Sequence, residues 1–153
     1  MEQALQDAFA ANSICFGCGP ANAKGLRMRS FVRGEKVVAS FRPEAFHHAF
    51  PGVLNGGIIG SLLDCHCNWT GAWALMRSRR TDLPPWTVTA SYAIDLVRPT
   101  PMDAELALEA WVLSVGGDRA TIAGTLSANG RVCATCHGTF VAVTPAHPAY
   151  HGW

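Results

Sequence analysis

The strongest pattern along the chain is an apolar segment that starts at about Asn55 and ends at about Arg77. Its hydrophobic residues fall on nearly every side of a 3.6-residue period, which predicts a helix of roughly 30 Å. Because a helix that is apolar almost all round belongs in a protein interior, we expect this one to be buried. The residues that give it this character are Ile58, Ile59, Leu62, Leu63, Trp69 and Trp73.

Segments typical of β-strands follow the Pro84-Pro85 break. They end at turn residues, and the Asn129-Gly130 pair between the last two is a strong hairpin signal. A tail from Pro145 to Trp153 has no period, and we expect it to be a loosely ordered end. The four predicted strands are Thr87 to Val97, Glu105 to Val115, Arg119 to Ser127 and Val132 to Val143.

The residues before the long helix predict shorter elements. We expect a short helix over residues 2–10, then strands over Gly25 to Val32 and Lys36 to Arg42. These two strands join in a hairpin at Arg33-Gly34-Glu35. A loop rich in histidine and aromatic residues, Phe46 to Phe50, leads into the helix.

One long helix followed by a run of antiparallel strands is an α+β pattern. The helix is too apolar to lie against one face of a flat sheet, so we expect the sheet to curl around it, as in the hotdog fold. A length of 153 residues predicts one domain, residues 1–153, with its core at about 13–144 and the tail at 145–153.

One face of the predicted helix departs from the apolar pattern. Its small and polar residues recur at i, i+3, i+4, i+7 and i+11 and therefore share a face. Small residues can serve close packing, but an unpaired carboxylate in the middle of a buried helix costs free energy. We therefore expect Asp64 to be functional rather than only structural. This stripe consists of Gly57, Gly60, Ser61, Asp64 and Asn68.

Two glycines begin the same helix. Gly56 and Gly57 leave backbone N–H groups at a helix N-terminus, where developing negative charge is stabilised. Asp64 follows Gly57 by two turns and returns to the same face. An oxyanion site and a carboxylate in one groove are the minimum equipment for hydrolysing an ester or thioester.

Composition narrows the classes of protein and partner. Hydrophobic residues make up 49% of the chain and charged residues 15%, which suits a compact protein and suggests that part of its surface is covered by another subunit. A net charge of +1 argues against binding nucleic acid through its backbone. We expect no membrane span, no signal peptide in residues 1–11, and six free thiols in the cytoplasm.

The chain resembles the hotdog-fold acyl-CoA thioesterases, in particular their PaaI-like (phenylacetate-pathway type) branch. Each motif that carries the resemblance is weak alone, but the ordered set spans about residues 13 to 144. The motifs are Cys15-Phe-Gly-Cys-Gly-Pro20 with Gly25-Leu26, Pro51-Gly-Val-Leu-Asn-Gly-Gly57, Leu62-Leu-Asp64, Leu96-Val-Arg-Pro-Thr-Pro101 and Gly138-Thr-Phe-Val141.

The resemblance implies an acyl-CoA substrate, no cofactor, and a homodimer or dimer of dimers whose active sites lie between protomers. It also implies a catalytic role for Asp64 and an oxyanion role for the Gly57 amide, with Gly56 beside it. The family commonly has histidine where this chain has Asn55. An amide can donate a hydrogen bond to the substrate carbonyl but cannot titrate near neutral pH, so an acid–base role is not expected of Asn55. Two interpretations of Asn55 stay open: it caps the helix N-terminus, a position that asparagine favours, or it also donates to the thioester carbonyl beside the Gly57 amide and so takes part in catalysis.

A thioester suits this equipment because its leaving group is a thiolate, with a conjugate-acid pKa of about 8.5. It departs without a strong general acid. Asp64 can attack directly, giving a mixed anhydride, or activate water, and the sequence does not choose between these routes.

Two other functions stay open for this sequence. The first is a hydratase or dehydratase that acts on an acyl thioester, a reaction that needs a histidine paired with an acid. The second is a non-catalytic module that binds acyl-CoA.

Other polar residues are candidates for substrate contacts. Ser61 and Asn68 share the stripe of Asp64, and His48, beside His47, precedes the glycine turn. Arg98 and Arg119 lie near strand ends and can meet the phosphates of coenzyme A. The tryptophans near the helix, Trp69, Trp73 and Trp86, are expected to line the core or the acyl pocket.

Cysteines offer two further interpretations. Cys65, His66 and Cys67 follow Asp64 on the helix but point away from its face. We therefore expect buried thiols and a hydrogen-bonded core histidine.

The Cys15/Cys18 and Cys133/Cys136 pairs have the spacing of a four-cysteine zinc site. Cys133 and Cys136 fall in a predicted strand, where i and i+3 point to opposite faces. Cys18-Gly19-Pro20 also matches a metal-free segment of the resembled family, so we expect neither a metal site nor a redox role.

Overall fold

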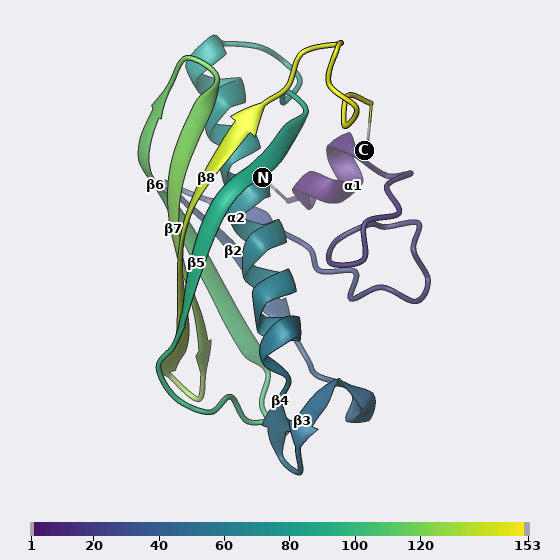
Figure 1. Cartoon of the computed structure of the whole chain (residues 1–153), viewed down its shortest axis with the longest axis vertical. Coiled ribbons are helices and arrows are strands. Elements are labelled where there is room, and N and C mark those ends of the chain that lie inside the picture. The colour runs from purple at the N-terminus through teal and green to yellow at the C-terminus, as the bar shows by residue number, and fades with distance from the viewer. Residues whose placement is uncertain (1, 152–153) are drawn as a thin grey trace.

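The long predicted helix is α2 (Gly56–Arg79), 24 residues in length, in the computed structural model, which describes residues 2–151. It lies against one face of a six-stranded antiparallel sheet that curves beside it (Figure 1). The strand order is β1-β2-β6-β7-β8-β5, so that β1 and β5 form the two edges. The strands are β1 (Phe31–Arg33), β2 (Lys36–Phe41), β5 (Thr87–Leu96), β6 (Leu106–Gly116), β7 (Arg119–Ala128) and β8 (Arg131–Ala142).

The α+β class, the curved sheet around a buried helix and the four long strands agree with the sequence prediction. The β1–β2 hairpin turns at Gly34, as expected, and Gly34 has a φ of +62° that suits glycine. The short first helix is α1 (Leu5–Phe9).

The predicted strand from Gly25 to Val32 is wrong over most of its length, because β1 begins only at Phe31. The backbone N–H groups of Leu26 and Met28 donate to the carbonyls of Phe16 and Gly17, at 2.7 and 3.1 Å. This segment therefore pairs with the N-terminal loop instead of extending the sheet.

The loop from Phe46 to Phe50 contains more structure than the sequence indicated. It forms a 3-10 turn η1 (Ala45–His47) and a strand β3 (His48–Phe50). A second short strand, β4 (Val53–Leu54), pairs with β3 and delivers the chain to the start of α2.

The N-terminal segment covers the side of α2 that faces away from the sheet (Figure 1). Gln6 of α1 bonds Ser30 through both ends of its amide, and the Ser30 hydroxyl bonds His66 Nδ1 at 2.8 Å. His66 Nε2 then donates to the Val37 carbonyl of β2 at 3.0 Å. This network of buried polar groups joins α1, the N-terminal loop, α2 and the sheet.

Helix α2 approaches the sheet closely at Gly124 of β7. A Cβ added to Gly124 would lie 2.8 Å from the Cys67 sulfur and 3.3 Å from the Glu109 carbonyl oxygen. Only glycine therefore lets the buried Cys67 side of the helix reach the strand at this point.

The described part of the tail is better packed than predicted. The rings of Tyr150 and His151 lie 6.1 and 5.7 Å from that of Trp86, centroid to centroid. Residues 152 and 153 lie outside the described residues. Between residues 2 and 151, no helix has both the length and the apolar character needed to cross a membrane.

Candidate active site

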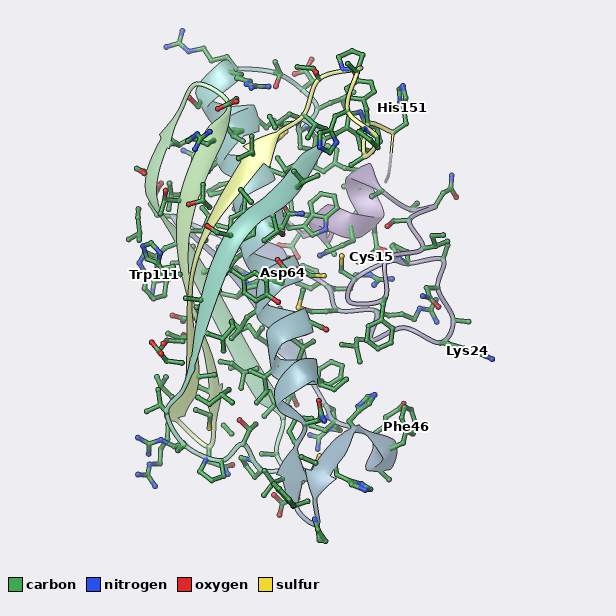
Figure 2. The ribbon with its side chains drawn as sticks, in the orientation of Figure 1. Cys15, Lys24, Phe46, Asp64, Trp111 and His151 are labelled. Atoms are coloured by element: carbon green, nitrogen blue, oxygen red, sulfur yellow. The ribbon has the colours of Figure 1, made fainter. Side chains whose placement is uncertain are left out.

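The small and polar stripe of α2 is the part of the helix middle that remains accessible. Asp64, Ser61 and Asn68 are half-buried, whereas Leu62, Leu63 and the other residues between them that face the sheet are fully buried. The residues of the predicted face are therefore partly accessible, and Asp64 lies in the N-terminal half of the helix (Figure 2). No hydrogen bond from the Ser61 hydroxyl occurs within the described residues.

Edge strand β5 runs beside this stripe in the opposite direction to α2. Strand residues spaced two to four apart meet successive turns of the helix, so the stripe and the strand lie side by side along their length. The neighbouring pairs, from the helix start, are Gly56 with Leu96, Gly60 with Tyr92, Asp64 with Thr89 and Asn68 with Thr87.

Thr89 is the direct partner of the candidate catalytic carboxylate. Its hydroxyl donates to Asp64 Oδ1 at 2.6 Å, which fixes the orientation of the carboxylate. Burial raises the pKa of Asp64, the Thr89 bond lowers it, and the charge on Cys15 adds a smaller increase. Sequence reasoning missed Thr89, because nothing in a strand sequence indicates which helix residue it faces.

Asn55 caps α2, as its side-chain type predicts. Its Oδ1 accepts hydrogen bonds from the N–H groups of Gly57 and Ile58, at 2.8 and 3.2 Å. The Gly57 amide, one of the two predicted oxyanion donors, is therefore engaged by the cap. The Gly56 N–H makes no hydrogen bond within the described part of the chain and is free to meet a substrate oxygen.

A pocket of about 450 Å³ opens at this end of the helix. Gly56 and Ile59 of α2 and Leu96 of β5 form one part of its wall, and β3 and β4 form another. Arg98 also lines the pocket, and its Nε is buried without a hydrogen-bond partner in the described structure. The lining is mostly apolar, which suits an acyl chain.

One chain does not bring the oxyanion amides and Asp64 to a single reacting carbon. Seven residues at 1.5 Å each separate Gly57 from Asp64 by about 10.5 Å along the helix. In the reaction, the carbonyl oxygen of the substrate must lie about 3 Å from an oxyanion amide. The carboxylate must at the same time lie about 3 Å from the carbonyl carbon or from the water that attacks it. Helical periodicity predicted that the two groups share a face, but their separation along the helix axis keeps them from acting together on one substrate within a protomer.

Known structures resemble this chain over most of its length. A thioesterase superfamily protein from Shewanella loihica is 34% identical, with a TM-score of 0.65, over 76% of this chain and 91% of that one. The chain belongs to the thioesterase superfamily. No family model and no curated protein matches the sequence.

More distant thioesterases share the fold. Thioesterase superfamily member 2 from zebrafish is 22% identical, with a TM-score of 0.64, over 80% of this chain and 90% of that one. A hypothetical thioesterase from Streptococcus pneumoniae, crystallised with coenzyme A, is 16% identical with a TM-score of 0.61. That match covers 74% of this chain and 85% of the other. The hotdog fold expected from the sequence is thus confirmed.

In this chain, the two arginines proposed for phosphate contacts lie far apart. Arg98 follows β5 near the N-terminal end of α2. Arg119 begins β7 near the C-terminal end, where the adjoining Gly117 carbonyl accepts from Arg79, and it pairs with Asp118 at 3.4 Å. A single protomer cannot use both on one phosphate group.

The histidines of the β3 region do not approach Asp64 in the described structure. His47 is buried, contacts the rings of Phe41 and Phe46, and accepts from the Glu44 N–H at 3.0 Å. His48 is exposed, and its Nδ1 bonds the Ala45 carbonyl. It borders the pocket through its neighbours Ala49 and Phe50 rather than lining it.

His66 is the hydrogen-bonded core histidine that the sequence predicted, and burial lowers its pKa to about 4. Cys67 is buried and contacts Cys136. The four cysteines of the two Cys-x-x-Cys pairs do not gather in the described residues. Cys15 and Cys18 instead meet Cys65, a partner that the sequence analysis did not consider.

Proposed function

We propose that this protein is an acyl-CoA thioesterase of the PaaI-like type that acts in the cytoplasm. The observation that carries the proposal is the Asp64–Thr89 pair: a half-buried carboxylate on the helix, held by a 2.6 Å hydrogen bond to the edge strand β5. The apolar pocket at the helix start supplies space for an acyl group. The structural relative that was crystallised with coenzyme A supports coenzyme A as the thiol portion of the thioester substrate.

The reaction breaks the bond between the acyl carbon and sulfur. Asp64 takes a proton from water as the water oxygen attacks the carbonyl carbon, or its own oxygen attacks to form a mixed anhydride that water then cleaves. The Gly56 N–H stabilises the negative charge on the carbonyl oxygen. Coenzyme A departs as a thiolate. In the general-base route the proton held by Asp64 passes to this thiolate or to solvent, which restores the carboxylate and leaves coenzyme A and the acid as products.

Two protomers complete each site in this proposal. Because Asp64 lies about 10.5 Å along the helix from the first amides, the carboxylate of one protomer acts with the helix start of its partner. Strand β5 offers the surface for such a dimer, since one of its edges is unpaired. Tyr92, Leu96 and Val97 expose 46%, 59% and 54% of their surface there.

The environment of Asp64 favours hydrolysis over hydration or dehydration of an acyl thioester. Those reactions need a histidine paired with an acid, but the partner of Asp64 is a threonine hydroxyl. His66, the nearest histidine in sequence, has both ring nitrogens bonded within the core.

Release of free thiol from a panel of short, long and aromatic acyl-CoAs tests the function. We expect turnover of at least one of them, and a loss of at least ~10²-fold in Asp64→Asn, in line with acid–base contributions. Thermal melting of that variant should match the wild type, which separates catalysis from folding. Binding without turnover would instead identify an acyl-CoA-binding module.

Light scattering tests the shared site. A dimer or tetramer of the 16.3 kDa chain is expected. A stable, active monomer would contradict the two-protomer arrangement while leaving the hydrolytic function intact.

A further inference from the structure

Three thiols from two distant segments converge on the side of α2 that faces away from the sheet. The sulfur atoms of Cys15, Cys18 and Cys65 all lie within 4.8 Å of one another, and those of Cys15 and Cys65 are 3.7 Å apart. Figure 2 shows Cys15 beside the middle of the helix, on the strand-free side. No disulfide joins any of the six cysteines.

The loop that carries Cys15 and Cys18 is built to hold them in place. Its backbone folds back on itself, with the Gly19 N–H donating to the Cys15 carbonyl at 2.8 Å. Gly17 lies against the helix so closely that an added Cβ would overlap the Cys65 sulfur. Gly17 is therefore required for the loop to bring its thiols to Cys65.

We propose that Cys15, Cys18 and Cys65 bind one thiophilic metal ion, with Zn²⁺ as the first candidate. Sulfur ligands at 2.3 Å around a tetrahedral zinc ion lie about 3.8 Å apart, close to the Cys15–Cys65 separation. No other cysteine, histidine or carboxylate of residues 2–151 joins the cluster, so water takes the fourth position. Binding releases the thiol protons to solvent.

The ion would fasten the N-terminal loop to α2 at the residue after Asp64. No step of the proposed thioesterase reaction uses a cysteine thiol of this chain. The inference therefore does not rest on the proposed function, and its test needs no substrate.

The test is metal uptake by the full chain under reducing conditions. Purified apoprotein is titrated with Co²⁺, and the sulfur-to-cobalt charge-transfer absorption is recorded. Competition with Zn²⁺ and elemental analysis then give affinity and stoichiometry. We expect one ion per chain and a charge-transfer band that Zn²⁺ abolishes.

Two substitutions identify the ligands. Cys15→Ser changes an exposed cysteine and should weaken Zn²⁺ binding by more than the ~10–100-fold that loss of an outer partner costs. Cys133→Ser changes a cysteine outside the cluster and should bind like the wild type. If Cys15→Ser fails to fold, Cys18→Ser takes its place.

Three results would overturn the proposal. The first is an absence of Co²⁺ and Zn²⁺ uptake by the reduced wild type, and the second is equal affinity in Cys15→Ser and Cys133→Ser. The third is a Cys15–Cys65 disulfide, found by peptide mass mapping, in protein that binds no metal even after reduction. That last outcome would identify the thiols as a redox pair.

Discussion

The Thr89 hydroxyl donates a hydrogen bond of 2.6 Å to Asp64 Oδ1, which links the lone carboxylate of α2 to the edge strand β5. The two residues are 25 positions apart and come from elements that run in opposite directions. Their contact orients the acid at the open side of the sheet. A second subunit at that edge would therefore meet a carboxylate whose position is already set.

This contact predicts a catalytic effect of Thr89. Thr89→Val keeps the branched shape but removes the donor, and we expect turnover to fall roughly 10-fold, since a hydrogen bond to a charged group contributes ~1.5–3 kcal/mol. Thr89→Ser keeps the hydroxyl and should restore most of the turnover. The measurement is kcat and KM for both variants. Equal kcat in the valine and serine variants would show that the bond only stabilises the fold.

The second prediction concerns the free amide of Gly56. Gly56→Pro deletes that N–H at a helix position that proline favours, and the extended conformation of Asn55 suits a residue before proline. We expect turnover to fall by ~10²-fold or more, as for loss of one oxyanion donor. Gly56→Ala keeps the N–H and serves as the matched control, with turnover near that of the wild type.

The third prediction follows if sites are shared between protomers. Co-expression of Asp64→Asn and Gly56→Pro chains should give mixed dimers in which one site has two intact halves. With random pairing, about a quarter of all sites are then intact, which the two-fold symmetry of the dimer dictates. Thiol release by the mixture should far exceed that of either parent. No recovery, with mixed dimers verified by differential tags, would mean that each chain builds its own site.

The fourth prediction concerns Asn55, whose capping role is visible in its bonds to Gly57 and Ile58. Asn55→Asp can still cap but can only accept hydrogen bonds at neutral pH, and it adds a negative charge beside the oxyanion. Stability should stay within ~1 kcal/mol while turnover falls roughly 10²-fold. Thermal melting and thiol release measure the two effects. Unchanged activity would leave only the cap.

The fifth prediction tests the packing of α2 on β7. Gly124→Ala places a methyl group against the Cys67 sulfur and the Glu109 carbonyl and should lower the free energy of unfolding by ~1–3 kcal/mol. Gly116→Ala, at a strand position with open space around it, should change that free energy by less than ~0.5 kcal/mol. Urea denaturation of both variants gives the comparison.

Local sequence patterns were sufficient to predict the long helix and the four long strands of the fold. The all-round apolar pattern after Asn55 predicts a buried helix, and the asparagine itself marks its start, because both signals depend only on neighbours within a few turns. The Asn129-Gly130 hairpin is likewise a property of adjacent residues. The accessible face of Asp64 followed from helical periodicity alone.

The tertiary structure decided every contact between residues far apart in the chain. Thr89 meets Asp64, and Cys15 meets Cys65, only because the strand and the N-terminal loop pack on opposite sides of one helix. Helical periodicity predicted the direction of the Asp64 side chain. It says nothing about distance along the helix axis, where the rise of 1.5 Å per residue separates Asp64 from Gly57. Residues 25–30 do not form the predicted strand for a similar reason, since the N–H groups of Leu26 and Met28 donate to Phe16 and Gly17. A sequence pattern records which groups need partners, and only the folded chain decides which partners are within reach.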